Sequence, residues 1–223
     1  MRKTLKSYLV FTSFFYKLVL FLALPVGMMG VVFWAGVHTY EVGLMLMALL
    51  WPMAETISDS WLFGGLQTKD TEKLDCLKAS GSGRRVLRDA LIVDLVRKFL
   101  SILIMMGICL IGIEVIRQTA GDGAVTGTLE IKSEEIWLFI ELIALSYFCS
   151  VLGTFLSRYG SMLWVSMMVG YGMLLLEIGC IMLAGAWGNG MIPALLFAAL
   201  GILVSILTVR TGISKLDQSF YDK

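Results

Sequence analysis

The sequence is best understood from residues 66–98, LQTKDTEKLDCLKASGSGRRVLRDALIVDLVRK. They form the one long polar interruption in a chain that is otherwise apolar enough to lie in a membrane. This stretch holds eight of the eighteen lysines and arginines: Lys69, Lys73, Lys78, Arg84, Arg85, Arg88, Arg97 and Lys98. Loops that cross a bilayer rarely keep so many basic residues. The stretch is therefore predicted to lie in the cytoplasm, between two membrane spans.

Inside this stretch the pattern predicts two helices. Thr68 and Asp70 can cap a short amphipathic helix, which the run 81–83, Gly-Ser-Gly, would end. A second helix is expected from about Arg84, and it would run without a Pro or Gly into the bilayer. The short helix would thus lie just outside the membrane.

The rest of the chain is strongly apolar. It has 223 residues, 58% hydrophobic residues and a mean hydropathy of +0.84, which indicates an all-α integral membrane protein. We expect one transmembrane domain over 1–223. Its parts would be an interfacial helix at 1–17, a cytoplasmic segment at 66–90 and six spans at 18–37, 42–64, 91–113, 134–156, 161–184 and 194–209. With both termini in the cytoplasm, only two of the eighteen basic residues, Arg117 and Lys132, lie outside. Because cytoplasmic segments carry the excess of Lys and Arg, this orientation is predicted.

Residues for catalysis or metal binding are scarce. The single histidine, His38, falls at a predicted outer turn, and the four cysteines are widely spaced. Residues 80–83, Ser-Gly-Ser-Gly, are not followed by the Lys and Ser or Thr of a phosphate loop. We therefore expect no enzyme activity, no metal or cofactor bound by this chain, and no nucleic-acid partner.

The second span carries two acids near its cytoplasmic end. Glu55 and Asp59 stand at i,i+4, so they share a face that should avoid lipid. We expect them to pair with basic residues at the start of the third span, namely Arg84, Arg85 and Arg88. Such pairs often set the geometry of two helices more than they add net stability.

Three further acids fall within or at the end of apolar spans: Glu141, Glu177 and Glu114. Ionisable groups at such depth are costly unless they face a partner or a wet cavity. One interpretation is a shared cavity for a cationic substrate or peptide. The other is that Glu141 and Glu177 bond to neighbouring Ser, Tyr or Trp groups or reach the interface.

The short polar helix also allows two interpretations. It can be a solvated loop element, or it can be a coupling helix that docks in a groove of a separate ATPase and transmits movement to spans two and three. In the second case the docking residues would be Leu74, Asp75, Leu77 and Lys78.

Taken together, the interfacial N-terminal helix, the six spans, the basic loop after span two and the Gly/Pro-marked break before span six resemble the permease subunit of a type-2 ABC exporter. The chain is similar in particular to small permeases of Gram-positive bacteria that work with a separate ATPase, some of them exporting antimicrobial peptides. The resemblance implies a coupling helix at 71–80, a re-entrant outer segment at 186–193 and a bacterial plasma-membrane location. It also implies a second permease chain, identical or related, and partner ATPases that hold ATP and Mg.

Two other functions fit the same topology less closely. A substrate-capture subunit of an energy-coupling-factor importer also has six spans, but it normally has short cytoplasmic loops, unlike 66–90. A membrane scaffold or sensor that transports nothing is the other alternative.

Overall fold

The computed structural model describes residues 7–9, 11–12, 14–36, 40–62, 81–120, 133–159, 163–186 and 191–218, and within these ranges the chain is helical with no strand. The elements are α2 (Phe14–Leu18), the π-helix η1 (Val19–Ala23), α3 (Leu24–Gly36), α4 (Tyr40–Leu62), α7 (Gly83–Ala120), α8 (Ser133–Tyr159), α9 (Leu163–Ala186) and α10 (Met191–Gln218). The predicted all-α class is therefore confirmed.

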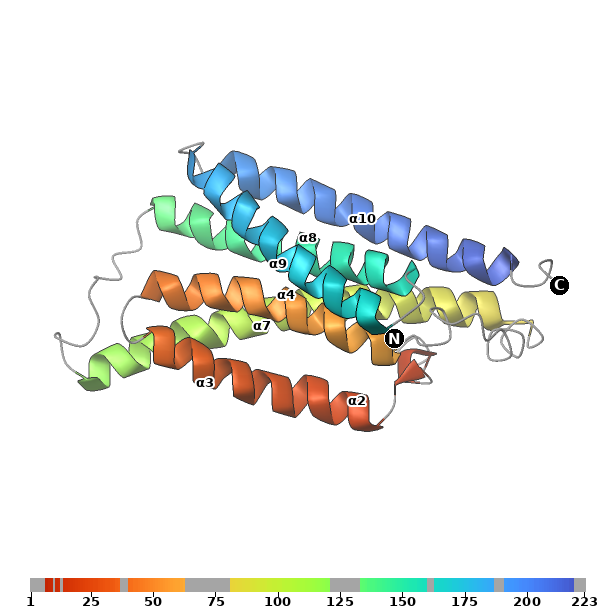
Figure 1. The fold of residues 1–223 in the computed structure, drawn as a ribbon, viewed down its shortest axis with the longest axis horizontal. Helices are drawn as coiled ribbons and strands as arrows, with labels where there is room; N and C mark the ends of the chain where they lie inside the picture. Colours follow the sequence, from red (N-terminus) through yellow and green to blue (C-terminus); the bar gives the residue numbers. More distant parts are fainter. Residues whose placement is uncertain are drawn as a thin grey trace.

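The long helices lie side by side and run in alternating directions (Figure 1). One end of the bundle gathers the starts of α2, α7 and α9 together with the ends of α4, α8 and α10. Four segments are long and apolar enough to cross a membrane: Val42–Asp59, Gly83–Gly112, Ile136–Arg158 and Met191–Ser214. A shorter apolar helical stretch covers Tyr16–Gly30. The chain thus has the character of a multi-pass membrane protein.

Several element ends differ from the sequence-based expectation. α7 has 38 residues, so it begins before and ends after the predicted span 91–113. α10 continues to Gln218, well past 209. Met191 to Pro193, expected in a re-entrant segment, form the first turn of α10, where a proline costs little because first-turn N–H groups have no helical acceptor. The proposed docking residues Leu74, Asp75, Leu77 and Lys78 lie outside the described residues.

α4 contains Pro52 yet continues as one helix, and α8 explains how. Because proline has no N–H, the carbonyl of Ala48 loses its usual donor four residues along. The Ser146 hydroxyl of α8 donates to that carbonyl at 3.0 Å. A side chain from a neighbouring helix thus replaces the missing bond, which is the usual way that membrane helices tolerate proline.

The helical run that contains Pro25 changes helix type just before this proline. The five residues before Leu24 form η1, in which the Leu24 N–H bonds to Val19 O, five residues back. Such π-turns commonly occur where the regular hydrogen-bond ladder is interrupted. In this way α2, η1 and α3 follow one another without a gap, and Lys17 is part of that helical run.

α10 packs tightly against α8 at Gly201. A Cβ added there would lie 3.0 Å from Tyr147 Cδ1 and 3.7 Å from the backbone Cα of Phe148. One turn later, the Tyr147 hydroxyl and Ser205 Oγ are 2.9 Å apart and hydrogen-bonded. A bulky side chain at Gly201 must therefore push the two helices apart.

We expect Gly201→Leu to lower the free energy of unfolding by about 1–3 kcal/mol, the usual cost of overpacking. Gly107→Leu is the matched control, because a Cβ at Gly107 of α7 meets nothing within 4 Å. Thermal unfolding of the purified variants in detergent measures both. Equal unfolding midpoints for the two variants would contradict the close approach at Gly201.

Candidate functional site

Six charged side chains meet in the interior between α4, α7 and α8, and we call them the ion cluster. They are Glu55 and Asp59 of α4, Asp94, Arg97 and Lys98 of α7, and Arg158 of α8. Five of them are at most 1% exposed, and Arg97 is 11% exposed. The cluster lies toward the end of the bundle at which α4 and α8 end and α7 begins (Figure 1).

One half of the cluster joins α4 to α7. Arg97 donates from Nη1 to Glu55 Oε1 at 2.8 Å and from Nη2 to Glu55 Oε2 at 2.7 Å. It also donates from Nε to Asp94 Oδ1 at 3.3 Å. Ser101 Oγ lies 3.0 Å from Glu55 Oε1 and accepts from Trp51 Nε1 at 3.3 Å. The fork of the guanidinium thus fixes the two helices through a bidentate pair.

The other half adds α8. Arg158 donates to both oxygens of Asp59, from Nε and from Nη2, each at 2.8 Å. It also bonds to Asp94 Oδ2. Lys98 Nζ lies 3.2 Å from Asp59 Oδ1 and donates to the Thr154 hydroxyl of α8. Each of the three helices is therefore bonded to the other two.

The ion cluster holds three carboxylates and three cations, so its charges balance. Burying a charge is costly unless a partner with good geometry compensates it, and here every charge has one. The expected effect is on geometry: the helices cannot slide or turn against each other without separating charges in a dry interior.

The partners of Glu55 and Asp59 differ from those expected. Both acids are buried, as their i,i+4 spacing predicts, but they pair with Arg97, Lys98 and Arg158. The basic residues proposed as partners lie at the exposed start of α7 instead. There Arg84 pairs with Asp217 at 3.3 Å, Arg88 pairs with Asp89 at 3.6 Å, and Arg85 is exposed.

The reason is the relative height of the two helices. α4 and α7 pack so that Glu55 is level with Arg97, which is three or more turns further into α7 than Arg84 and Arg85. A signal was present in the sequence. Asp94 with Arg97 and Lys98, at i,i+3 and i,i+4, places three charges well inside the helix, where each of them needs a partner.

The N-terminal segment packs next to the cluster. Tyr8 and Tyr16 join a buried group with Leu20, Leu87 and Leu91. Burial raises the pKa of Tyr8, and the nearby Asp94 raises it further. Its phenol is therefore neutral at physiological pH and adds no charge near the ion cluster.

Glu177 of α9 is a buried acid that, unlike the acids of the ion cluster, pairs with no basic side chain among the described residues. It is fully buried, and neither carboxyl oxygen has a hydrogen-bond partner among the residues that the structure describes. Ser146, Cys149 and Cys180 are its polar or thiol neighbours. The Ser146 hydroxyl lies beside the Glu177 carboxyl but donates its proton to Ala48 O, so it can meet Glu177 only as an acceptor while that bond is kept.

The structure does not join the three deep acids into one site. Glu141 is 5% exposed, but it lies five to eight residues before the part of α8 that faces Glu177, a separation of about 8–12 Å along the helix. Glu114 lies near the far end of α7 and makes an interaction of its own. Glu177 is the most deeply buried of the three, and its nearest hydroxyl is that of Ser146.

Within the described ranges, no group of three or more His, Cys, Asp or Glu residues is placed to hold a metal ion. Comparison of the chain with protein-family models, with curated proteins and with solved structures finds no match.

Proposed function

We propose that this chain is the permease subunit of an ABC exporter of the bacterial plasma membrane. A second permease chain and separate ATPase subunits, which bind ATP and Mg, would complete the transporter. In this proposal, the chain spans the membrane six times and both termini lie in the cytoplasm. The observation that carries it is the ion cluster, because of where the cluster lies in the chain.

The cluster bonds together the two helices that flank the polar segment 63–80. α4 ends at Leu62, just before this segment, and α7 begins at Gly83, just after it. Glu55 and Asp59 lie within two turns of the end of α4, and the contacts of Asp59 with Arg158 extend the link to α8. A force applied to 63–80 by an ATPase would therefore move three helices as one body, which is what a coupling element requires.

The burial of Glu177 favours a substrate that carries a cationic group. A buried carboxyl with no basic side chain beside it among the described residues gains most from a ligand that supplies hydrogen-bond donors or positive charge. An amine or guanidinium of a peptide has both properties. The proposed substrate class is therefore a cationic peptide.

The test is purification of the tagged chain from its native membrane in mild detergent, followed by mass spectrometry of the bound proteins. We expect an ABC ATPase in stoichiometric amount, and we expect Leu74→Asp with Leu77→Asp to reduce it at least tenfold. Cys76→Asp is the matched control, since position 76 would point away from the face that holds 74 and 77 in a helix.

Two outcomes would contradict this proposal. Recovery of the chain alone with a tightly bound small ligand would favour the substrate-capture subunit of an energy-coupling-factor importer. Equal loss of the ATPase in the Cys76 control would show that 74 and 77 do not form the docking face.

A further inference from the structure

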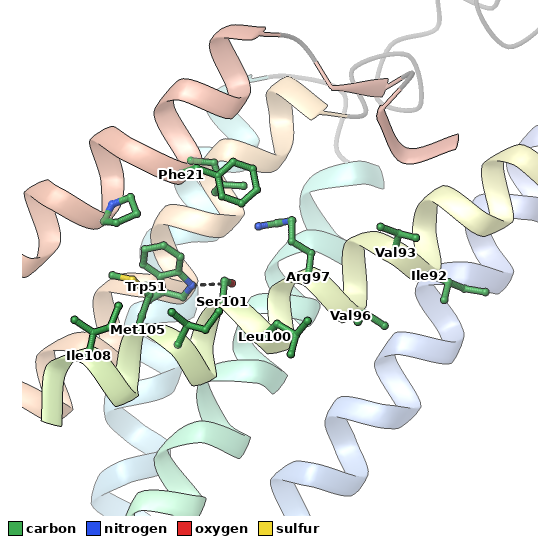
Figure 2. A pocket seen from close by; sticks show the side chains of 13 residues that line it. Phe21, Trp51, Ile92, Val93, Val96, Arg97, Leu100, Ser101, Met105 and Ile108 are labelled. Carbon is green, nitrogen blue, oxygen red and sulfur yellow. Dashed lines mark hydrogen bonds between the residues drawn. The ribbon is translucent and has the colours of Figure 1, made fainter. Parts of the chain in front are cut away.

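A groove opens between the η1–α3 run, α4 and α7. Its volume is about 880 Å³, within the range of sites that hold small ligands. Figure 2 shows Phe21 on one wall and Val96 with Leu100 on the other. We propose that this groove holds an acyl chain of an anionic phospholipid, whose headgroup lies against basic side chains at the groove's end.

The lining matches a hydrocarbon chain. Along α7 it runs from Ile92 to Ile108, a distance of about 24 Å, and the residues facing it are almost all apolar. Phe21 and Ile104 are 60% and 58% exposed, so large apolar surfaces face the groove without a protein partner in the described chain. Exposed apolar area of this extent favours an apolar occupant.

The polar groups on the groove floor do not call for a charged occupant. Arg97 is already bonded to Glu55 and Asp94, and Trp51 donates to Ser101, as the dashed line in Figure 2 shows. The charge balance of the ion cluster leaves no free cation there. A headgroup must therefore find its partners beyond the groove.

Basic side chains lie at the end of the groove where α7 begins. Arg88 precedes Ile92 by one turn and Arg85 precedes it by two, so both lie on the face that lines the groove. Arg85 is exposed. Among the described residues Arg88 pairs with Asp89 alone, in a partly exposed pair that contributes little. Lys17 stands four residues before Phe21 on the opposite wall. Basic groups at this height attract anionic headgroups.

The experiment uses the full purified chain in nanodiscs that contain phosphatidylglycerol and phosphatidylcholine with identical acyl chains. Native mass spectrometry after transfer to detergent counts the retained lipids. We expect phosphatidylglycerol to be retained at about one per chain and phosphatidylcholine to be lost. The inference concerns the chain's own surface and does not depend on the proposed transport function.

Two variants test the two halves of the site. Ile104→Trp fills the groove and should reduce retention at least fivefold, whereas Ile206→Trp, at an equally exposed position of α10, should not. Arg85→Gln with Arg88→Gln should weaken retention of phosphatidylglycerol about 30-fold, since each basic residue near the surface adds about a factor of five. Arg210→Gln, an exposed arginine of α10, is the control for charge.

Three results would overturn the proposal. Equal retention of the two lipids would remove the role of the basic end. Equal behaviour of Ile104→Trp and Ile206→Trp would show that the retained lipid is merely annular. A stable chain dimer without lipid, dissociated by Ile104→Trp, would show that a second copy of the chain covers the groove instead.

Discussion

Replacement of Arg158 by methionine is expected to lower the free energy of unfolding by about 3–5 kcal/mol, the cost of removing one partner from a buried ion pair. Arg158 is fully buried and donates to Asp59 twice and to Asp94 once. Without it, the cluster would hold three carboxylates against two cations. One negative charge would then remain uncompensated in a dry interior.

The measurement is titration of the purified chain from mild detergent into sodium dodecyl sulfate, followed by circular dichroism. Arg84→Met is the matched control. Its pair with Asp217 is exposed on both sides, at 70% and 51%, so its loss should cost less than about 1 kcal/mol. The comparison separates burial of the pair from the mere presence of a salt bridge.

A double variant isolates charge balance from packing. Arg158→Met combined with Asp59→Asn leaves two carboxylates and two cations. This variant should recover more than half of the stability lost in Arg158→Met. If it is less stable than Arg158→Met alone, the individual hydrogen bonds matter more than the balance of charge, and the neutral-cluster account is wrong.

The same geometry alters what charge reversal at Glu55 or Asp59 would do. The sequence places both acids near the cytoplasmic end of the second span, where charge reversal is the simplest probe of coupling to an ATPase. Both are at most 1% exposed and each faces a cation, so reversal would place like charges in contact. A neutral, shape-conserving change such as Glu55→Gln is therefore the better probe of coupling.

Local pattern predicts much of this molecule. Hydropathy and basic-residue placement locate the apolar helices, and the i,i+4 spacing of Glu55 and Asp59 correctly implies a face turned away from lipid. The partners of these acids could not be read in the same way, because they depend on how far α7 slides along α4. Periodicity within one helix carries no information about that register, so the sequence favours Arg84, Arg85 and Arg88 merely because they begin the next helix.

The role of Ser146 illustrates the same limit. Pro52 implies that the carbonyl of Ala48 lacks its helical donor, and this much follows from the sequence alone. Which side chain supplies the donor depends on the contact of α4 with α8, 98 residues away. The same contact engages the proton of Ser146, the hydroxyl beside Glu177, so a proline in one helix weakens the hydrogen bonding of an acid in another.

Glu177→Met is expected to raise the free energy of unfolding by about 1–3 kcal/mol, a change opposite in sign to that of Arg158→Met. The carboxyl of Glu177 is fully buried, and its one hydroxyl neighbour, Ser146, donates to Ala48 O, so folding removes the hydration of the carboxyl and returns little. Methionine has a similar volume and no polar group to desolvate. A natural chain that keeps the less stable residue is expected to need it for function.

Under the proposed function, the same variant should lose export of a cationic peptide by at least tenfold while export of a neutral peptide of equal length changes less than twofold. Transport into inverted vesicles that contain the full transporter measures both peptides. Glu141→Met is the control for a deep acid that lies away from the Glu177 neighbourhood. Destabilisation by Glu177→Met would mean that the carboxyl has a partner in the folded chain. Stabilisation with equal loss for both peptides would leave the buried acid as a structural feature of α9 and would remove it from the substrate path.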